Sequence, residues 1–273
     1  MRDALAYEWV RIRTLRSTWL LTALSLVLTA LPAVAIALNP SSGTPLQEGE
    51  SFQVLGDQRA YALVLTSGAQ FASLLMGLVG AFAFGHEYRY GTVRAALTAL
   101  PVRDRLAAAK VLVVALWAAV VGLLCVVVSA VVALLLRGGR YQPGVSLTEG
   151  TTLRVALGVV LYVVLIALLG LALGWLFRSI PAAVAVLLVT PLVVEPLLRL
   201  LLSLDLLEPI SRVGRYLPYG AGAQLYAYST EIDLDVPEAF RNDLSPLAGG
   251  VTLALAVAVL AAVAHLLFRR RDA

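Results

Sequence analysis

The residue types that usually carry catalysis or bind metals are scarce in this sequence. The only histidines are His86 and His265, and neither belongs to an H-E-x-x-H pair. The single cysteine, Cys125, cannot build a disulfide framework or a cysteine-based metal site. No G-x-x-x-x-G-K-S/T phosphate-binding loop occurs, and the only lysine is Lys110. We therefore expect neither a catalytic site nor a metal or other cofactor on this chain.

Charged residues inside an apolar run are the next candidates. Glu195 and Arg199 lie four residues apart in one such run, which places them on one face of a helix. An ionisable residue within a membrane span is by default a functional candidate. For these two residues we favour an ion pair at the outer headgroup region over a functional role.

The segment 86–105 combines charged residues with a short apolar repeat. Its apolar residues fall at i, i+3, i+4 and i+7, the pattern of an amphipathic helix; they are Val93, Ala96, Leu97 and Leu100. Gly91 begins this helix and Pro101 ends it. Glu87, Arg89 and Arg94 are expected to make polar contacts with a partner. Two alternatives stay open, namely that Glu87 pairs with a nearby arginine or that the segment is only a solvated loop.

The elements that position these residues are strongly apolar. Of the 273 residues, 60% are hydrophobic and 14% are charged, and the mean hydropathy is +0.88. Soluble domains carry roughly 45–50% apolar and about 25% charged residues, so a soluble domain, a disordered chain and a secreted disulfide scaffold are excluded. Six apolar runs are long enough to cross a bilayer as helices: 18–38, 61–84, 106–136, 153–177, 180–204 and 247–268. We expect an all-α, polytopic membrane protein.

The stretches before and between these runs carry patterns of their own. Residues 1–17 predict a short amphipathic helix with Leu5, Trp9 and Ile12 on one face, unless this stretch only extends the first span. Residues 205–246 are too apolar for a free loop and too interrupted to span the bilayer. Outer re-entrant or interfacial helices are therefore expected there.

Two features predict how the fourth span packs. Gly170 and Gly174 form a G-x-x-x-G pattern, which lets two helices approach closely, and we favour packing within the chain over dimerisation. Only Arg178 and Ser179 separate the fourth and fifth spans. These two spans must therefore form a tight antiparallel hairpin.

The distribution of Lys and Arg orients the chain. With the N-terminus in the cytoplasm, 13 of the 21 Lys and Arg residues but only 5 of the 17 acidic residues face inward. Six spans then place both termini in the cytoplasm. The excess of basic over acidic residues is therefore explained by contact with the inner leaflet of the lipid bilayer, so no nucleic-acid partner is expected.

The order of these parts resembles the permease subunits of type-2 ATP-binding-cassette (ABC) transporters, in their bacterial export branch. The closest residue match is the run from Glu87 to Thr92, followed by Leu100 to Arg105 and by Lys110. A second match, from Tyr216 to Ala223, is similar to the family's segment before the last span. The resemblance extends over nearly the whole chain. It implies a single transmembrane permease domain, residues 1–273, in a bacterial plasma membrane.

The resemblance also implies partners and site residues. Two permease copies, identical or related, form the pathway as a dimer, and separate ABC ATPase subunits bind ATP and Mg. The helix 91–100 sits in a groove of the ATPase, with coupling residues Glu87, Arg89, Gly91, Val93, Arg94, Leu97 and Pro101. The family's second and fifth spans face the pathway, which makes Thr66, Gln70, Ser73 and Glu195 candidate lining residues. Hydrogen bonding between helices explains the strip of Thr66, Gln70 and Ser73 equally well.

Two other classes of membrane protein compete with this interpretation. An ion-coupled secondary transporter or channel is expected to carry charges near mid-span, whereas the middles of the first, second, third, fourth and sixth spans are uncharged. A membrane-embedded enzyme requires a polar catalytic constellation, and none is found in the sequence. The transport subunit of an ABC exporter, without enzyme activity of its own, is the preferred interpretation.

Overall fold

The computed structural model describes residues 1–38, 61–89, 91, 103–137, 150–202, 212–228 and 244–270. Within these ranges nearly every residue is helical and no residue is in a strand. Six helices are long and apolar enough to cross a membrane: Arg16–Leu38, Tyr61–Tyr88, Asp104–Leu136, Gly150–Phe177, Ile180–Leu202 and Pro246–Phe268. The prediction of an all-α protein with six spans is confirmed. Apart from Gly91, the predicted helix 91–100 lies outside the described residues, as does much of 205–246.

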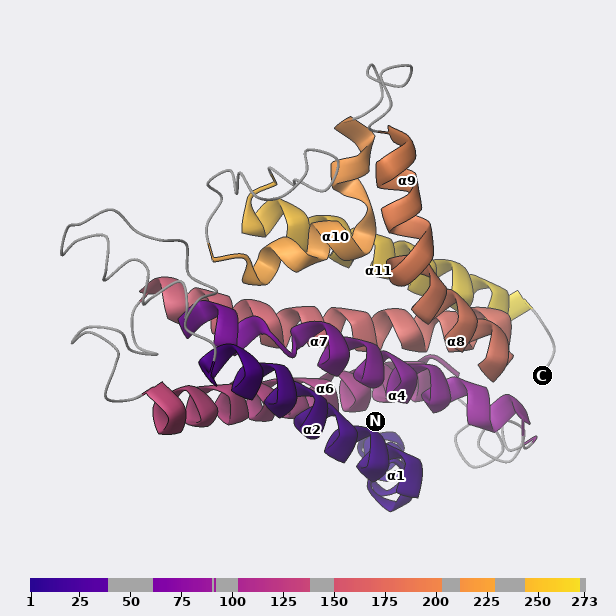
Figure 1. Cartoon of the computed structure of the whole chain (residues 1–273). Coiled ribbons are helices and arrows are strands. Elements are labelled where there is room, and N and C mark those ends of the chain that lie inside the picture. Colours follow the sequence, from indigo (N-terminus) through magenta and orange to yellow (C-terminus); the bar gives the residue numbers. More distant parts are fainter. Residues whose placement is uncertain are drawn as a thin grey trace, which may run out of the picture.

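Five of the spans contain one long helix each: α2 (Arg16–Leu38), α4 (Ala69–Arg89), α6 (Arg103–Arg137), α7 (Gly150–Phe177) and α11 (Pro246–Arg270). The fifth span consists of α8 (Ile180–Val189), a π-helical turn η2 (Thr190–Val194) and α9 (Glu195–Leu202). Shorter helices are α1 (Arg2–Thr14), α10 (Pro218–Ala223) and the 3₁₀ turn η4 (Gln224–Tyr226). In Figure 1, α2, α4, α6 and α7 lie side by side, and α8 and α11 pack against α7.

Helix α7 lies at the centre of the bundle, and its glycines set how closely α4 approaches it. A Cβ atom at Gly170 would lie 1.9 Å from the carbonyl oxygen of Gly77, and one at Gly174 would lie 2.4 Å from that of Ala81. Any side chain at either position would push the two helices apart. The favoured packing of the G-x-x-x-G pattern within the chain is confirmed.

The connection between the fourth and fifth spans is as short as the sequence requires. Arg178 adopts a φ of 54°, in the left-handed region that non-glycine residues seldom occupy, and the chain reverses there. Its guanidinium lies 5.0 Å from the centre of the Tyr88 ring on α4, a cation–π contact. The predicted tight hairpin is confirmed.

The second span is interrupted near its start. Residues 61–66 are helical, a turn follows at Ser67 and Gly68, and α4 begins at Ala69. A Cβ atom at Gly68 would lie 2.5 Å from the Cα of Thr29, so this turn lies directly against α2. The predicted polar strip is therefore divided, because Thr66 precedes the turn whereas Gln70 and Ser73 follow it.

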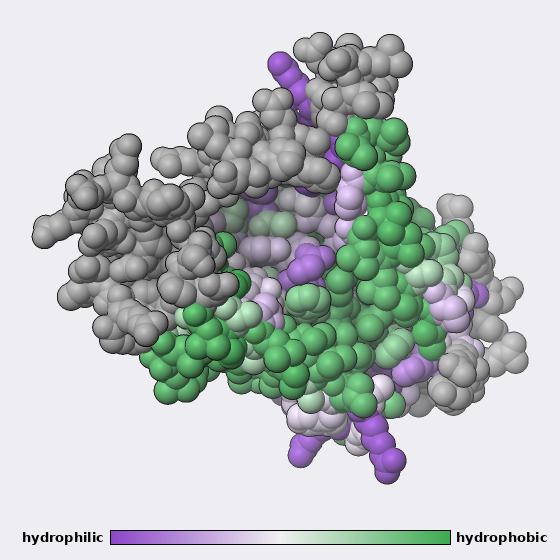
Figure 2. Space-filling view, in the orientation of Figure 1, coloured by the Kyte–Doolittle hydropathy of each residue, from purple (hydrophilic) through white to green (hydrophobic). Residues whose placement is uncertain are grey.

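Two prolines accompany the irregular course of the fifth span. Proline has no backbone N–H, and its ring crowds the preceding helical turn. The π-helical turn η2 contains Pro191, and Pro196 follows in the first turn of α9. This span is the least buried of the six. Figure 2 shows a largely hydrophobic surface over it, which suits contact with lipid or with another membrane protein.

Helix α1 is separate from the first span, because Leu15 between α1 and α2 is extended. The residues that α1 buries are Ala4, Glu8 and Ile12. Trp9, which the sequence places on the apolar face of an interfacial helix, is 40% exposed, whereas Ile12 of the same face is buried. Glu8 is buried as well, because Arg11 and Lys110 are its charged partners.

Candidate functional site

Four charged side chains from three helices meet near the end of the bundle where α4 ends. This charge cluster consists of Glu8 and Arg11 of α1, Glu87 of α4 and Lys110 of α6. The Nζ of Lys110 donates to Glu8 Oε1 at 2.5 Å and also to Glu87 Oε1. The Nη1 of Arg11 donates to Glu87 Oε1 at 2.9 Å and to the carbonyl oxygen of Ala83 at 2.7 Å. Two positive and two negative charges therefore compensate one another.

Three of the four side chains of the charge cluster are shielded from solvent, and that of Arg11 is 17% exposed. The side chain of Lys110 is fully buried, and those of Glu8 and Glu87 are 2% and 4% exposed. Removing one partner of a buried ion pair typically costs about 3–5 kcal/mol, because the other charge is left unpaired. The cluster thus holds α1 against α4 and α6. Tyr7 of α1, which lies outside the spans, is close to the cluster. Its partial burial is the main cause that raises the pKa of its hydroxyl, and the negative charges of Glu87 and Glu8 raise that pKa further.

The predicted coupling residues are placed differently from one another. Glu87 belongs to the charge cluster, and Arg11 is the nearby arginine with which it pairs. A buried Glu87 is not available for direct contact with a partner protein. Gly91 has a φ of +66°, a conformation that glycine adopts readily. Arg89 ends α4, whereas Val93, Arg94, Leu97 and Pro101 lie outside the described residues.

Sequence reasoning missed Glu8 and Lys110 as members of one site. In the count of charges, Lys110 is only one more basic residue on the side of the inner leaflet. In the structure, Lys110 bonds to both carboxylates of the charge cluster. A signal was available in its position, since the chain's only lysine lies within an apolar run. Glu8 carried a weaker signal, because it lies three residues before Arg11 on one helix face.

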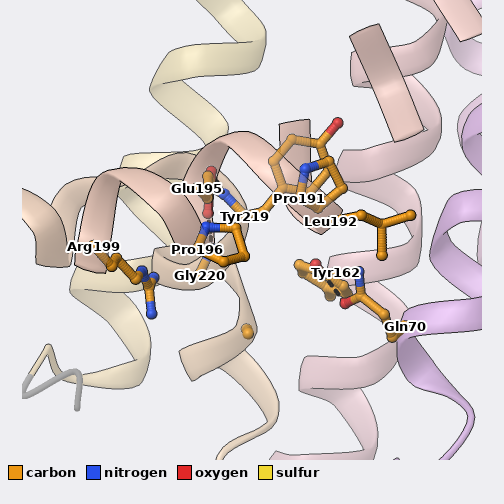
Figure 3. Close-up of a pocket in the computed structure, with 10 residues that line it drawn as sticks. Gln70, Tyr162, Pro191, Leu192, Glu195, Pro196, Arg199, Tyr219 and Gly220 are labelled. Carbon is orange, nitrogen blue, oxygen red and sulfur yellow. Dashed lines mark hydrogen bonds between the residues drawn. The ribbon is translucent and has the colours of Figure 1, made fainter. Parts of the chain in front are cut away.

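A pocket lies between the fifth span and α10, and we call it the α9–α10 pocket. Its volume is about 290 Å³, and it is lined by Gln70, Tyr162, Pro191, Leu192, Glu195, Pro196, Arg199, Tyr219, Gly220 and Ala223. Figure 3 shows Arg199 on one side of Glu195, and Leu192, Tyr162 and Gln70 on the other. In Figure 2 the surface beside α9 is hollowed, and polar residues lie in the hollow. The pocket brings together Gln70 and Glu195, two of the four predicted lining residues.

Glu195 attaches the fifth span to α10. Its Oε1 accepts a hydrogen bond from the backbone N–H of Tyr219 at 2.8 Å, and its Oε2 accepts one from that of Gly220 at 2.9 Å. These N–H groups belong to the first turn of α10, where the helix itself provides no acceptor. The predicted ion pair with Arg199 is wrong, because both carboxylate oxygens bond to the backbone instead. Spacing along one helix favours the pair, but α10 brings two backbone donors within 2.8 and 2.9 Å of the carboxylate.

Arg199 lies one turn further along α9 and lines the same pocket. Its Nε and Nη2 are buried, and neither has a hydrogen-bond partner in the described part of the chain. The guanidinium lies against α10, since a Cβ atom at Gly220 would be 1.5 Å from Nη2. A buried donor without an acceptor costs about 1–3 kcal/mol. The pocket therefore holds a positive group with unused hydrogen-bonding capacity.

The predicted polar strip of the second span divides between the pocket and the helix interior. Gln70 lines the pocket, and its Oε1 accepts a hydrogen bond of 3.2 Å from the Tyr162 hydroxyl of α7. Thr66 donates to the carbonyl oxygen of Ala62 in its own helix, and the buried Ser73 donates to that of Gln70. Gln70 thus forms the hydrogen bond between helices that one interpretation of the strip predicts, and it also lines the pocket. That Thr66 and Ser73 line a pathway stays a prediction.

The two histidines lie beside aromatic and acidic neighbours. The ring of His86 stacks on Phe82 with 4.8 Å between centroids. His265 Nε2 lies 3.3 Å from Asp104 Oδ1, which brings the last part of α11 to the start of α6. In the ranges that the structure describes, no three His, Cys, Asp or Glu side chains are grouped as metal ligands would be.

The six apolar helices and their buried polar contacts define the chain as a multi-pass helical membrane protein. The sequence model of the ABC-2 family transporter protein matches residues 4–193, well over half of the chain, and the protein belongs to this family of ABC transporter membrane proteins. The resemblance predicted from the sequence is confirmed. A search of curated proteins found no match. The charge cluster lies within the matched range, whereas Glu195 and Arg199 lie just beyond it.

Proposed function

We propose that this chain is the membrane-spanning permease subunit of an ABC exporter in a bacterial plasma membrane, with both termini in the cytoplasm. Two permease copies form the translocation pathway, and separate ATPase subunits bind ATP and Mg. The family match over residues 4–193 is the observation that carries the proposal. Because the sequence has no phosphate-binding loop, this chain supplies the pathway and the coupling rather than ATP hydrolysis.

The charge cluster supports a route for that coupling. Helix α4 ends at Arg89 and α6 begins at Arg103, so the expected coupling helix 91–100 connects these two helices. Glu87 and Lys110 bond the helices to each other close to this connection, and α1 is bonded to the same point. A force that an ATPase applies to the connecting segment would reach three helices together, because separating them exposes unpaired buried charges.

The arrangement of the chain ends agrees with the expected orientation. In Figure 1 the end of α4 and the end of α11 lie at the same end of the bundle. Contacts of Glu8 with Lys110 and of His265 with Asp104 bring α1 and the end of α11 to the start of α6. A shared cytoplasmic side for these segments follows from the excess of Lys and Arg there.

Co-purification with an ABC ATPase tests the proposal. We expect a neighbouring gene to encode an ABC ATP-binding subunit, and we expect that subunit to purify with this chain from a neutral detergent. Replacing Val93 and Leu97 together by Asp removes the apolar face of the expected coupling helix and should abolish the complex. Thr98→Asp is the control, because it adds one negative charge, where the double variant adds two, to the expected opposite face of the same segment.

Two results would contradict parts of this proposal. The proposed partnership is wrong if the folded wild-type chain purifies without the ATPase and if adding the chain to the reconstituted ATPase does not raise its rate of ATP hydrolysis. If Thr98→Asp disrupts the complex as strongly as V93D/L97D, the apolar face is not the docking face. Transport driven by an ion gradient, in vesicles that contain this chain alone, would establish the ion-coupled alternative.

A further inference from the structure

We infer that the α9–α10 pocket binds an amphipathic anion. The guanidinium of Arg199 holds the anionic group, and the apolar part of the ligand lies against Pro191 and Leu192. Binding itself depends only on the pocket, whereas naming such molecules as the substrate class of the permease rests on the proposed function.

The hydrogen bonds in the pocket favour an anion over a cation. Both oxygens of Glu195 are engaged by the backbone N–H groups of Tyr219 and Gly220, whose partial positive charge at the start of α10 stabilises the carboxylate. The Nε and Nη2 of Arg199 have no acceptor among the described residues. An arginine with open donors forms strong, charge-assisted hydrogen bonds with phosphate, sulfate or carboxylate groups. An anionic group would supply the acceptors that this guanidinium lacks.

The remaining walls of the pocket favour a ligand with an apolar chain. Pro191, Leu192 and Pro196 form the wall on the fifth span. The surface over this span is largely hydrophobic in Figure 2, so a chain that leaves the pocket continues along an apolar surface. The volume of about 290 Å³ is near the lower limit of ligand pockets, which are roughly 300–1,000 Å³. It suits a headgroup with the first part of its chain.

The absence of a side chain at Gly220 fits the position of the positive charge of Arg199. A Cβ atom at this residue would lie 1.5 Å from Nη2 of Arg199, so the glycine makes room for the guanidinium. The guanidinium is the flexible end of a long side chain and can move away, so Gly220→Ala would displace the charge while the bundle stays folded. This substitution tests the placement of the charge without removing it.

Binding is measured by isothermal titration calorimetry of the purified full chain in a neutral maltoside detergent. The probe is octyl phosphate below its micellar concentration, with protein-free detergent as the blank. Octyltrimethylammonium has the same chain with the opposite charge, and inorganic phosphate has the headgroup without the chain. We expect saturable binding of octyl phosphate and much weaker binding of both comparison ligands.

Three variants locate the binding site. Arg199→Ala should weaken octyl phosphate binding roughly 10- to 100-fold, because hydrogen bonds to a charged group are lost. Gly220→Ala should weaken it less, since the charge is displaced but retained. Arg212→Ala is the matched control: this arginine is exposed and does not line the pocket, so its removal should leave binding unchanged.

The outcomes separate this inference from the proposed function. Equal binding of octyltrimethylammonium, or unchanged binding in both Arg199→Ala and Gly220→Ala, would overturn the inference. Equal binding of inorganic phosphate would overturn its amphipathic part. None of these titrations contains an ATPase, so such a failure would leave the proposed function standing.

A competition experiment distinguishes two sources of the anion. If nanodiscs of phosphatidylglycerol reduce octyl phosphate binding more than nanodiscs of phosphatidylcholine do, the natural ligand is an anionic membrane lipid. If the two kinds of nanodisc act alike while Arg199→Ala still weakens octyl phosphate binding, the ligand is a soluble amphiphile. Both outcomes support an anion site at Arg199.

Discussion

The charge cluster and the α9–α10 pocket both place ionisable residues inside a membrane protein, but they satisfy them in opposite ways. In the charge cluster, Lys110 and Arg11 bond to carboxylates from other helices. In the pocket, Glu195 bonds to backbone amides, and two nitrogens of Arg199 have no partner among the described residues. The first arrangement joins helices, whereas the second leaves hydrogen-bonding capacity for a ligand.

Solvent access explains why the two arrangements differ. Lys110 is fully buried, and a charge without water must be paired within the protein. Arg199 is only half-buried and lines a pocket beside a hydrophobic span, so its unused donors lie close to a space that a ligand can enter. Four predictions follow from this difference.

The largest effect is expected from Lys110→Met, which leaves Glu8 and Glu87 buried with only Arg11 as a partner. We expect the free energy of unfolding to fall by about 3–5 kcal/mol. Thermal unfolding is followed with a thiol-reactive dye, because Cys125 is the chain's single cysteine and is buried in the native state.

The double variant Glu8→Gln/Lys110→Met serves as the control for this prediction. It leaves Glu87 and Arg11 as a balanced pair, so part of the lost stability should return. If Lys110→Met unfolds at the wild-type temperature, the charge cluster does not hold the three helices together.

A smaller loss is expected from Glu195→Ala, which removes the acceptor of two backbone N–H groups at the start of α10. The free energy of unfolding should fall by about 1–3 kcal/mol. Glu195→Gln keeps one acceptor oxygen and should lose less. The same thermal unfolding assay measures both variants, and equal stability of Glu195→Ala and the wild type would show that this carboxylate does not attach α10.

Arg199→Met is expected to keep the free energy of unfolding or to raise it by about 1–3 kcal/mol, because it removes buried donors that have no described partner. Octyl phosphate binding should nevertheless weaken roughly 10- to 100-fold, as in Arg199→Ala. This pairing of retained stability with weakened binding is the opposite of what Lys110→Met should show. If Arg199→Met destabilises the protein as much as Lys110→Met does, then the α9–α10 pocket, like the charge cluster, serves to hold helices together.

The smallest effect is expected at the polar strip of the second span. Gln70→Ala removes a neutral hydrogen-bonding group from the pocket wall and should weaken octyl phosphate binding roughly 2- to 10-fold. Thr66→Ala should not change it, since Thr66 bonds within its own helix. Equal titration curves for both variants would exclude Gln70 from the binding site.

Much of the fold was predictable, because membrane spans are specified by local composition. A run of apolar residues long enough to cross the bilayer must form a helix, whatever its neighbours are. The connection at Arg178 and Ser179 was predictable for the same reason, since two residues between spans allow only a hairpin. The close packing at Gly170 and Gly174 also followed from the pattern of small residues.

The site residues were predicted less well, because partners in space are not set by spacing along one helix. Glu195 and Arg199 have the spacing of an ion pair, but the N–H groups that Glu195 binds lie on α10, more than twenty residues later. Lys110 and Glu8 are 102 positions apart, and no local pattern connects them. Gln70, predicted to line a pathway together with Thr66, lines the pocket, but the turn before α4 separates it from Thr66.

The sequence by itself determined the all-α class, the number of spans and the family, because hydropathy and short motifs are properties of single segments. Only the tertiary structure decided which charges are paired and which donors stay unused. That choice depends on how far each helix is rotated about its axis and on which neighbour it meets there, and both are set by the packing of the whole bundle.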